Sequence, residues 1–268
     1  MSSPDLSPSL PGKVIAVIGG TTGLGLSAAR ALVAAGAKVG LCGRSLESLD
    51  AALDELGHDQ ALGLCGDAAD SELAPALIGD LVARHGRLDG LYHVAGGSGR
   101  SRGDGPLHEM TDEGWAHTID LNLTSLVWSN RAAVRQFLEQ GGGGAILNMG
   151  SVLGFSPSPR HFASHAYAAA KSAVIGFSKS IAAYYARDNI RVNVIAPALV
   201  ETPMSGRARN DEAILEFIRA KQPLDGGRIG LPSDLDAAVV FLLGPGAACV
   251  TGQVLAVDGG WSVSEGLA

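Results

Sequence analysis

The sequence predicts an α/β fold with a parallel β-sheet of about seven strands and helices on both of its faces. Short apolar, β-branched runs alternate with longer Ala- and Leu-rich segments between residues 13 and 257, as in strands that are buried on both faces and joined by helices. The first run leads directly into a glycine-rich turn and a helix. Since neither a repeat nor a linker divides the chain, we expect one domain over residues 13–268, after a disordered lead-in over residues 1–12.

The composition excludes several classes of function. The net charge of −7 and the absence of a basic run argue against a nucleic-acid surface, which needs a basic footprint. No apolar segment is long enough to span a bilayer, and the N-terminus lacks the charged start and apolar run of a signal peptide. The three cysteines (Cys42, Cys65 and Cys249) lie too far apart for metal or redox pairing. We therefore expect a cytoplasmic protein without membrane or nucleic-acid partners.

The first half of the chain contains four apolar runs that we expect to form strands, at residues 13–18, 37–42, 61–65 and 88–94. Helices are expected between them, at about residues 24–35, 46–56 and 71–84. Strands and helices that alternate at this pace give parallel pairing through right-handed crossovers. The glycine turn at residues 19–25 would aim backbone N–H groups and a helix N-terminus at a phosphate.

The second half continues the pattern with longer helices. We expect helices at about residues 111–138, 165–186 and 232–243, and strands at residues 145–149, 190–195 and 253–257. Thr111 is the expected cap of the first of these helices, and the Pro232 segment that of the last. Residues 204–222 are expected to form a mobile loop and a short amphipathic helix, a segment suited to closing over a substrate.

Two polar segments have more than one interpretation. Arg100 and Arg102, in the loop after the fourth strand, could hold an anionic group of a substrate, but a solvated loop is the simpler interpretation. His161 and His165 have the spacing of metal ligands on a helix. The proline-containing loop around them argues against regular structure, so no metal site is expected.

Tyr167 and Lys171 are four residues apart, which places both side chains on one face of a helix. A lysine ammonium in that position can lower the pKa of a phenol, so that the phenol exchanges a proton with an alcohol or carbonyl. On its own, the pair could equally be a packed tyrosine and a solvated lysine. Ser151, at the end of a strand, is expected near this helix, and the mid-helix amide of Asn122 needs hydrogen-bond partners.

These residues occur in an order that resembles the short-chain dehydrogenase/reductase family, in its single-domain form, over residues 13–261. The resemblance rests on Gly19-x-x-x-Gly23-x-Gly25, Asp67, Ala95-Gly96, Asn122, Ser151, Tyr167-x-x-x-Lys171, Pro197 with Thr202, and Asp258-Gly259-Gly260. It implies a Rossmann-type doubly wound sheet. It also implies a catalytic tetrad of Asn122, Ser151, Tyr167 and Lys171.

The resemblance assigns a role to each member of the tetrad. Tyr167 would be the general acid or base, and Ser151 would hold the substrate oxygen. Lys171 would lower the pKa of Tyr167 and bind the nicotinamide ribose, and Asn122 would hold a water that links Lys171 to solvent. The implied cofactor contacts are Gly19, Thr21, Thr22, Gly23, Leu24, Gly25, Arg44, Asp67, Ala68, Ala95, Gly96, Tyr167, Lys171, Pro197, Val200 and Thr202.

The sequence departs from the family pattern at positions that support the cofactor site. Ile18 stands where a threonine is usual, His93 and Val94 replace two asparagines, and Ala198 replaces a glycine. The loop between Ser151 and Tyr167 is also longer than is usual. None of these changes removes a reacting group.

We therefore expect an NADP-dependent oxidoreductase that interconverts a ketone and a secondary alcohol. NADP is favoured over NAD because Gly43 occupies the position of the acidic residue of an NAD site, and Arg44 and Ser45 follow it. An epimerase or dehydratase, a non-catalytic NADP-binding sensor or partner subunit, and an NAD-preferring dehydrogenase remain alternatives. The apolar surface of the helix at residues 165–186 suggests a homotetramer.

Overall fold

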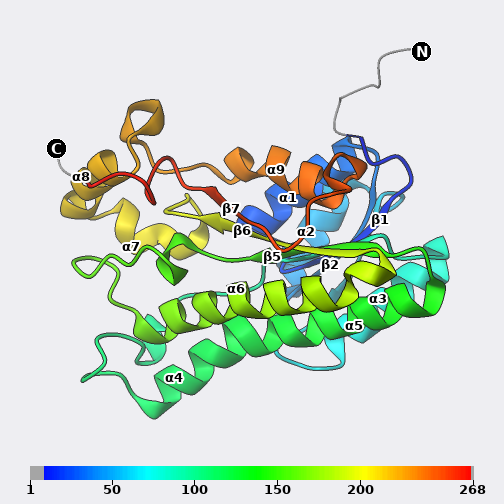
Figure 1. Ribbon diagram of the computed structural model, residues 1–268, viewed down its shortest axis with the longest axis horizontal. Coiled ribbons are helices and arrows are strands. Elements are labelled where there is room, and N and C mark those ends of the chain that lie inside the picture. The colour runs from blue at the N-terminus through cyan, green and yellow to red at the C-terminus, as the bar shows by residue number, and fades with distance from the viewer. Residues whose placement is uncertain (1–8, 267–268) are drawn as a thin grey trace.

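Five consecutive buried residues, Val14–Ile18, form the first strand of the fold. In the computed structural model, which describes residues 9–266, seven strands make one parallel sheet in the order β3-β2-β1-β4-β5-β6-β7 (Figure 1). The strands are β1 (Val14–Ile18), β2 (Lys38–Gly43), β3 (Ala61–Cys65), β4 (Gly90–His93), β5 (Gly144–Met149), β6 (Ile190–Pro197) and β7 (Val254–Val257). The predicted fold class is confirmed, and each strand lies within two residues of its expected bounds.

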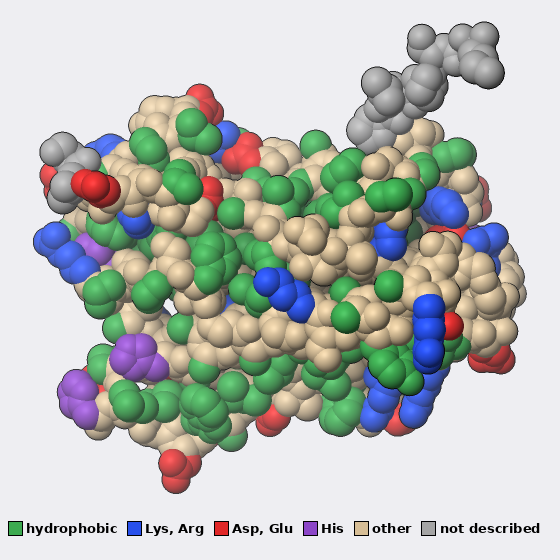
Figure 2. All heavy atoms as spheres, viewed as in Figure 1, with side chains coloured by type: hydrophobic (Ala, Val, Ile, Leu, Met, Phe, Trp, Pro, Cys, Tyr) green, Lys and Arg blue, Asp and Glu red, His purple; other side chains and the backbone are tan. Residues whose placement is uncertain are grey.

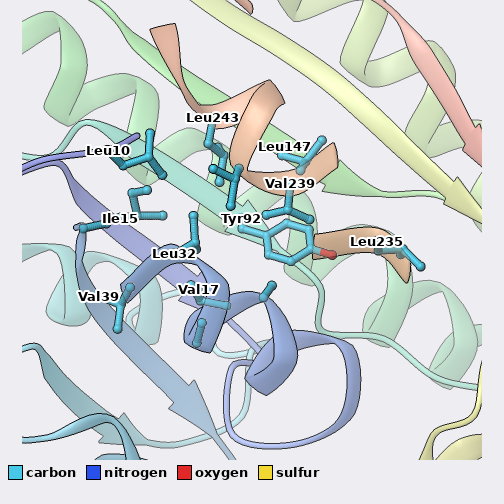
Figure 3. Packing of buried hydrophobic residues seen from close by; sticks show 14 of the residues in the cluster. Leu10, Ile15, Val17, Leu32, Val39, Tyr92, Leu147, Leu235, Val239 and Leu243 are labelled. Carbon is cyan, nitrogen blue, oxygen red and sulfur yellow. The ribbon is translucent and has the colours of Figure 1, made fainter. Parts of the chain in front are cut away.

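The sheet is buried on both faces because successive side chains of a strand point to opposite sides. Ile15 and Val17 belong to one hydrophobic cluster, whereas Val14, Ala16 and Ile18 belong to the other. Figure 3 shows the first cluster, in which side chains from the sheet meet side chains from two helices. The continuous apolar sequence of β1 follows from this arrangement.

Three helices cover each face (Figure 1). On one face lie α1 (Gly23–Ala34), α2 (Leu46–Leu56) and α9 (Asp236–Leu243); on the other lie α3 (Leu73–His85), α5 (Ser125–Gln140) and α6 (His165–Tyr185). The remaining helices are α4 (Asp112–Ile119), α7 (Gly206–Arg209) and α8 (Glu212–Lys221). No helix within residues 9–266 has the length and apolar character that crossing a membrane requires.

The helix expected at residues 111–138 is not regular throughout. Thr111 caps its start as predicted, and its hydroxyl accepts a hydrogen bond from Gly114 N at 3.0 Å. Between α4 and α5, however, one π-helical turn runs from Asp120 to Thr124. The Ser125 hydroxyl donates to Leu121 O at 2.7 Å, while the Ser125 backbone N–H reaches one residue further back, to Asp120 O. The Ser125 hydroxyl thus bonds the carbonyl oxygen that, in a regular α-helix, would accept a hydrogen bond from the Ser125 backbone N–H.

The expected disordered lead-in is wrong for the part of it that the structure describes. Leu10 is fully buried in the cluster around Ile15, and its backbone N–H donates to Ala35 O at 2.7 Å. Burial of this apolar side chain and the backbone hydrogen bond together offset the cost of ordering the segment. Residues 1–8 lie outside the described part of the chain.

Candidate active site

The carboxyl ends of the strands open into a cavity of about 770 Å³. Loops that follow β1 to β6 line it, and every residue expected to contact the cofactor is among the lining residues, as is Ser151. Asn122 does not line the cavity but lies behind it. Parallel sheets place ligands at this edge because the loops after neighbouring strands meet there.

The glycine turn leaves room for a phosphate group. Gly19 has a φ of +90°, and a Cβ on it would lie 2.7 Å from Ala95 N. A Cβ on Gly25 would lie 2.0 Å from Gly19 O, so the start of α1 packs directly on the turn. Thr22 precedes α1 without a side-chain cap, and the first turn holds no acidic residue. The free N–H groups of that turn therefore fit the pyrophosphate of a dinucleotide.

The end of β2 carries Gly43 at the position where an NAD site has an acidic side chain, and Thr21 packs against it. A Cβ on Gly43 would lie 2.3 Å from Thr21 Oγ1 and 2.7 Å from Thr21 Cγ2. Arg44 is exposed and lines the cavity, and within residues 9–266 no carboxylate oxygen lies within 4.0 Å of its guanidinium. Ser45 caps α2 by accepting a hydrogen bond from Ser48 N at 3.2 Å.

Lys171 is held against the end of β5. It is 2% exposed, its Nζ donates to Met149 O at 2.9 Å, and Nζ lies 5.6 Å from the centre of the Tyr167 ring. Burial lowers the pKa of Lys171 to about 8. The ammonium therefore lies on the same side of α6 as the phenol, as the spacing predicts.

The prediction that the pKa of Tyr167 lies below its ordinary value is wrong, since this pKa is raised. Burial raises the pKa of this phenol, and the hydroxyl of Ser151 opposes the rise. The Lys171 ammonium donates its hydrogen bond to Met149 O and not to the phenol. Ser151 is therefore the hydrogen-bonding neighbour that favours the ionised phenol.

Asn122 holds the turn after β4. Its Oδ1 accepts from Gly97 N at 3.0 Å, and its Nδ2 donates to Gly97 O and to Thr118 O, both at 2.9 Å. The predicted need for hydrogen-bond partners is met, but by backbone groups. In the structure, Asn122 supports the loop that carries Ala95 and Gly96 into the cavity.

Asp104 is a site residue that the sequence did not indicate. It is 4% exposed, and its carboxylate accepts from Ala166 N at 3.0 Å and from Tyr167 N at 3.1 Å. The local residue Ser164 makes no side-chain cap, so α6 takes its N-cap from the loop after β4. A negative charge suits this position because helix N-termini carry partial positive charge. Because Asp104 lies 62 residues before Ala166 in the sequence, no local sequence pattern at the start of α6 indicates this cap.

Aromatic and long apolar side chains form the other end of the cavity. Phe162, Leu153, Met204 and Trp261 line it, and the ring centres of Phe162 and Trp261 are 5.8 Å apart. Trp261 is buried, and its Nε1 donates to Ser156 O at 3.2 Å. Within the described range 9–266, no cluster of three or more His, Cys, Asp or Glu residues could hold a metal ion.

One edge of the sheet brings together the glycine turn, Ser151, Tyr167 and Lys171. This combination is typical of one class of protein. The chain belongs to the short-chain dehydrogenase/reductase family. A family model described as enoyl-(acyl carrier protein) reductase matches residues 19–262. The protein is thus a nicotinamide-dependent oxidoreductase that acts on alcohol or carbonyl groups.

Named relatives share almost the full length of the chain. It is 35% identical over 254 residues to galactitol 2-dehydrogenase (L-tagatose-forming) of Cereibacter sphaeroides, which covers 95% of this chain and 96% of the relative. It is 36% identical over 256 residues to 2-dehydro-3-deoxy-D-gluconate 5-dehydrogenase of Escherichia coli, with 94% and 96% covered. A short-chain type dehydrogenase/reductase from Mycobacterium ulcerans superposes with a TM-score of 0.87 at 31% identity, over 96% of this chain and 92% of that one.

Proposed function

We propose that this protein is an NADP(H)-dependent oxidoreductase that interconverts a ketone and a secondary alcohol. The observation that carries the proposal is the meeting of Ser151, Tyr167 and Lys171 in one cavity with a glycine turn that fits a pyrophosphate. A non-catalytic NADP sensor would need the glycine turn but not a buried hydroxyl beside a half-buried phenol. An epimerase or dehydratase would not need this set intact.

The reaction needs one proton to move at the substrate oxygen. When bound, the nicotinamide supplies or accepts the hydride, and Pro197, Val200 and Thr202 line the part of the cavity that would hold it. During reduction, the phenol of Tyr167 donates its proton to the carbonyl oxygen, while the hydroxyl of Ser151 donates a hydrogen bond to the same atom. In the oxidation direction, Tyr167 takes the proton of the alcohol.

A spectrophotometric screen tests the proposal. Purified protein is mixed with NADPH and a panel of ketones, and absorbance of the reduced nicotinamide is followed. The panel contains keto sugars, keto sugar acids and cyclohexanones, since relatives are named for substrates of the first two kinds. We expect substrate-dependent oxidation of NADPH. Tight NADPH binding without oxidation on any member of the panel would instead favour the sensor.

Arg44 is expected to read the 2′-phosphate of NADP. A guanidinium can pair a phosphate through two charge-assisted hydrogen bonds, and that of Arg44 is free at the cavity wall. We expect kcat/KM for NADPH to exceed that for NADH by about ten- to a hundredfold, or roughly 1.4 to 2.7 kcal/mol. Arg44→Ala should remove most of the preference. Arg102→Ala is the matched control, since Arg102 lies outside the cavity lining. Equal use of both cofactors by the wild type would contradict this assignment.

The assembly is proposed to be a homotetramer. Large apolar side chains are exposed on α4 to α6 and on the edge strand: Trp115 is 43% exposed, Leu138 49%, Tyr184 62% and Leu255 39%. Figure 2 shows the face that bears α4 and α6, with hydrophobic side chains among small and polar ones. Apolar groups at these positions gain from a partner surface. Light scattering at micromolar concentration should give four times the mass of one chain, and a monomer mass would refute the assembly.

The location is proposed to be cytoplasmic. Cys42, Cys65 and Cys249 are all free thiols, and Cys65 and Cys249 are exposed. Exposed free thiols suit a reducing compartment.

A further inference from the structure

Two guanidinium groups meet at the aromatic end of the cavity. Arg100 belongs to the turn Arg100–Arg102 after β4, and Arg207 belongs to α7 after β6. The Nη2 atoms of both residues donate to the same acceptor, His161 O, at 3.4 Å and 3.0 Å. The Arg207 guanidinium also lies 5.9 Å from the centre of the Phe162 ring. Loops that are far apart in the sequence thus bring two positive charges to one point of the cavity wall.

No acidic side chain neutralises this pair. Within residues 9–266, no carboxylate oxygen lies within 4.0 Å of either guanidinium. Asp104 is near enough to affect Arg100, but both of its oxygens accept N–H groups of α6. Burial and the charge of Arg207 both hold the pKa of Arg100 below its ordinary value, so each guanidinium destabilises the other. An anion between them would relieve that repulsion.

Arg102 provides the internal comparison. It lies in the same turn as Arg100, but its guanidinium pairs with Glu113 at 3.4 Å, and its side chain is 60% exposed. It does not line the cavity. The two arginines of one turn therefore differ: Arg102 has an acidic surface partner, whereas Arg100 lines the cavity and has no carboxylate within 4.0 Å among residues 9–266.

The cavity walls near Arg100 and Arg207 indicate what shape of ligand would fit. Leu153, Phe162, Met204 and Trp261 form apolar walls in the same cavity as Ser151 and Tyr167. A ligand that fills this space has a compact apolar body, with a reacting oxygen on one side and a negative charge on the other. Two guanidiniums can bind the two oxygens of a carboxylate at once.

We propose that the substrate carries a carboxylate that Arg100 and Arg207 bind while its ketone or alcohol lies against Ser151 and Tyr167. This substrate class rests on the proposed oxidoreductase function. The carboxylate-binding pair selects the substrate and orients its reacting carbon toward the catalytic groups.

A binding experiment tests the pair without turnover. Cyclohexanecarboxylate and its isosteric neutral amide, cyclohexanecarboxamide, are titrated by calorimetry into protein saturated with NADP⁺ and into protein alone. We expect the wild type to bind the acid at least about tenfold more tightly than the amide, or about 1.4 kcal/mol. Arg100→Gln and Arg207→Gln should each remove most of that preference, and Arg102→Gln should keep it. Equal binding of acid and amide by the wild type, or binding of neither, would overturn the proposal.

A kinetic experiment separates this proposal from the proposed function. The substrates are 4-oxocyclohexanecarboxylate and 4-oxocyclohexanecarboxamide, with NADPH as the reductant. The ratio of kcat/KM for acid over amide should fall toward one in Arg100→Gln and Arg207→Gln but not in Arg102→Gln. Variants that slow both substrates equally would show a structural role and overturn the carboxylate site. Acid-selective binding without turnover would refute the proposed function alone, and turnover without acid preference would refute the carboxylate site alone.

Discussion

Replacement of Tyr167 by phenylalanine is expected to lower kcat by a factor of about 10² to 10⁴. The substitution removes the hydroxyl that transfers the proton and keeps the ring against which Lys171 lies, 5.6 Å from its centre. Cofactor affinity should change by no more than about threefold, roughly 0.7 kcal/mol, because the glycine turn and Lys171 remain. Steady-state kinetics on a ketone that the wild type reduces, with fluorescence titration of NADPH, measure the two effects separately.

The control for this variant is Tyr184→Phe on the same helix. Tyr184 is 62% exposed and does not line the cavity, so its hydroxyl has no part in the proposed proton transfer. A Tyr167→Phe enzyme with more than about a tenth of the wild-type kcat would show that another group is the acid.

His93 is expected to lower the free energy of unfolding strongly as the pH falls below about 6.5. It is fully buried, its Nδ1 lies 2.8 Å from Ser129 Oγ, and burial, with the charge of Lys171, lowers its pKa to about 3. The unfolded chain has the ordinary pKa of about 6.5, so it binds a proton between pH 6.5 and 3 that the folded protein does not. The contribution is therefore fully present above pH 6.5 and is lost as the pH falls toward 3. The loss of unfolding free energy amounts to about 2 to 3 kcal/mol by pH 4.5 and about 5 kcal/mol by pH 3.

Urea denaturation at pH 7 and pH 4.5 measures this effect. His93→Asn should show a smaller drop in unfolding free energy between the two pH values than the wild type, whatever its stability at pH 7. His58→Asn is the control, since His58 is exposed and needs no burial of charge, and it should keep the wild-type drop. If His93→Asn and the wild type lost the same amount, proton uptake by His93 would not be the cause.

The strands could be predicted because their signal is local. The run at residues 14–18 is apolar at every position, which only a doubly covered strand requires, and Gly19 follows it where the turn has a positive φ. The residues of the cofactor cavity were implied by the family resemblance, and they occupy the strand ends. Once the parallel order was inferred, their meeting at one edge followed from the geometry of the sheet.

Features that depend on distant partners could not be predicted in this way. Asp104 caps α6 across 62 residues, and Arg100 meets Arg207 only through a shared carbonyl acceptor. Leu10 is expected in a disordered lead-in because the sequence does not show that its backbone bonds the distant Ala35. The direction of the Tyr167 pKa depends on burial of the phenol by the surrounding loops, which spacing on a helix does not specify.

The π-helical turn at Asp120–Thr124 makes the site sensitive to chain length as well as to residue type. Deletion of one residue there would allow regular helical bonding from α4 through α5, which local energetics favour. Because Asn122 lies within this turn, the same deletion would change the backbone that carries its amide, which now bonds both backbone groups of Gly97. Homologous chains that keep a working site should therefore tolerate substitutions in this segment far better than single-residue deletions, even deletions that strengthen the helix.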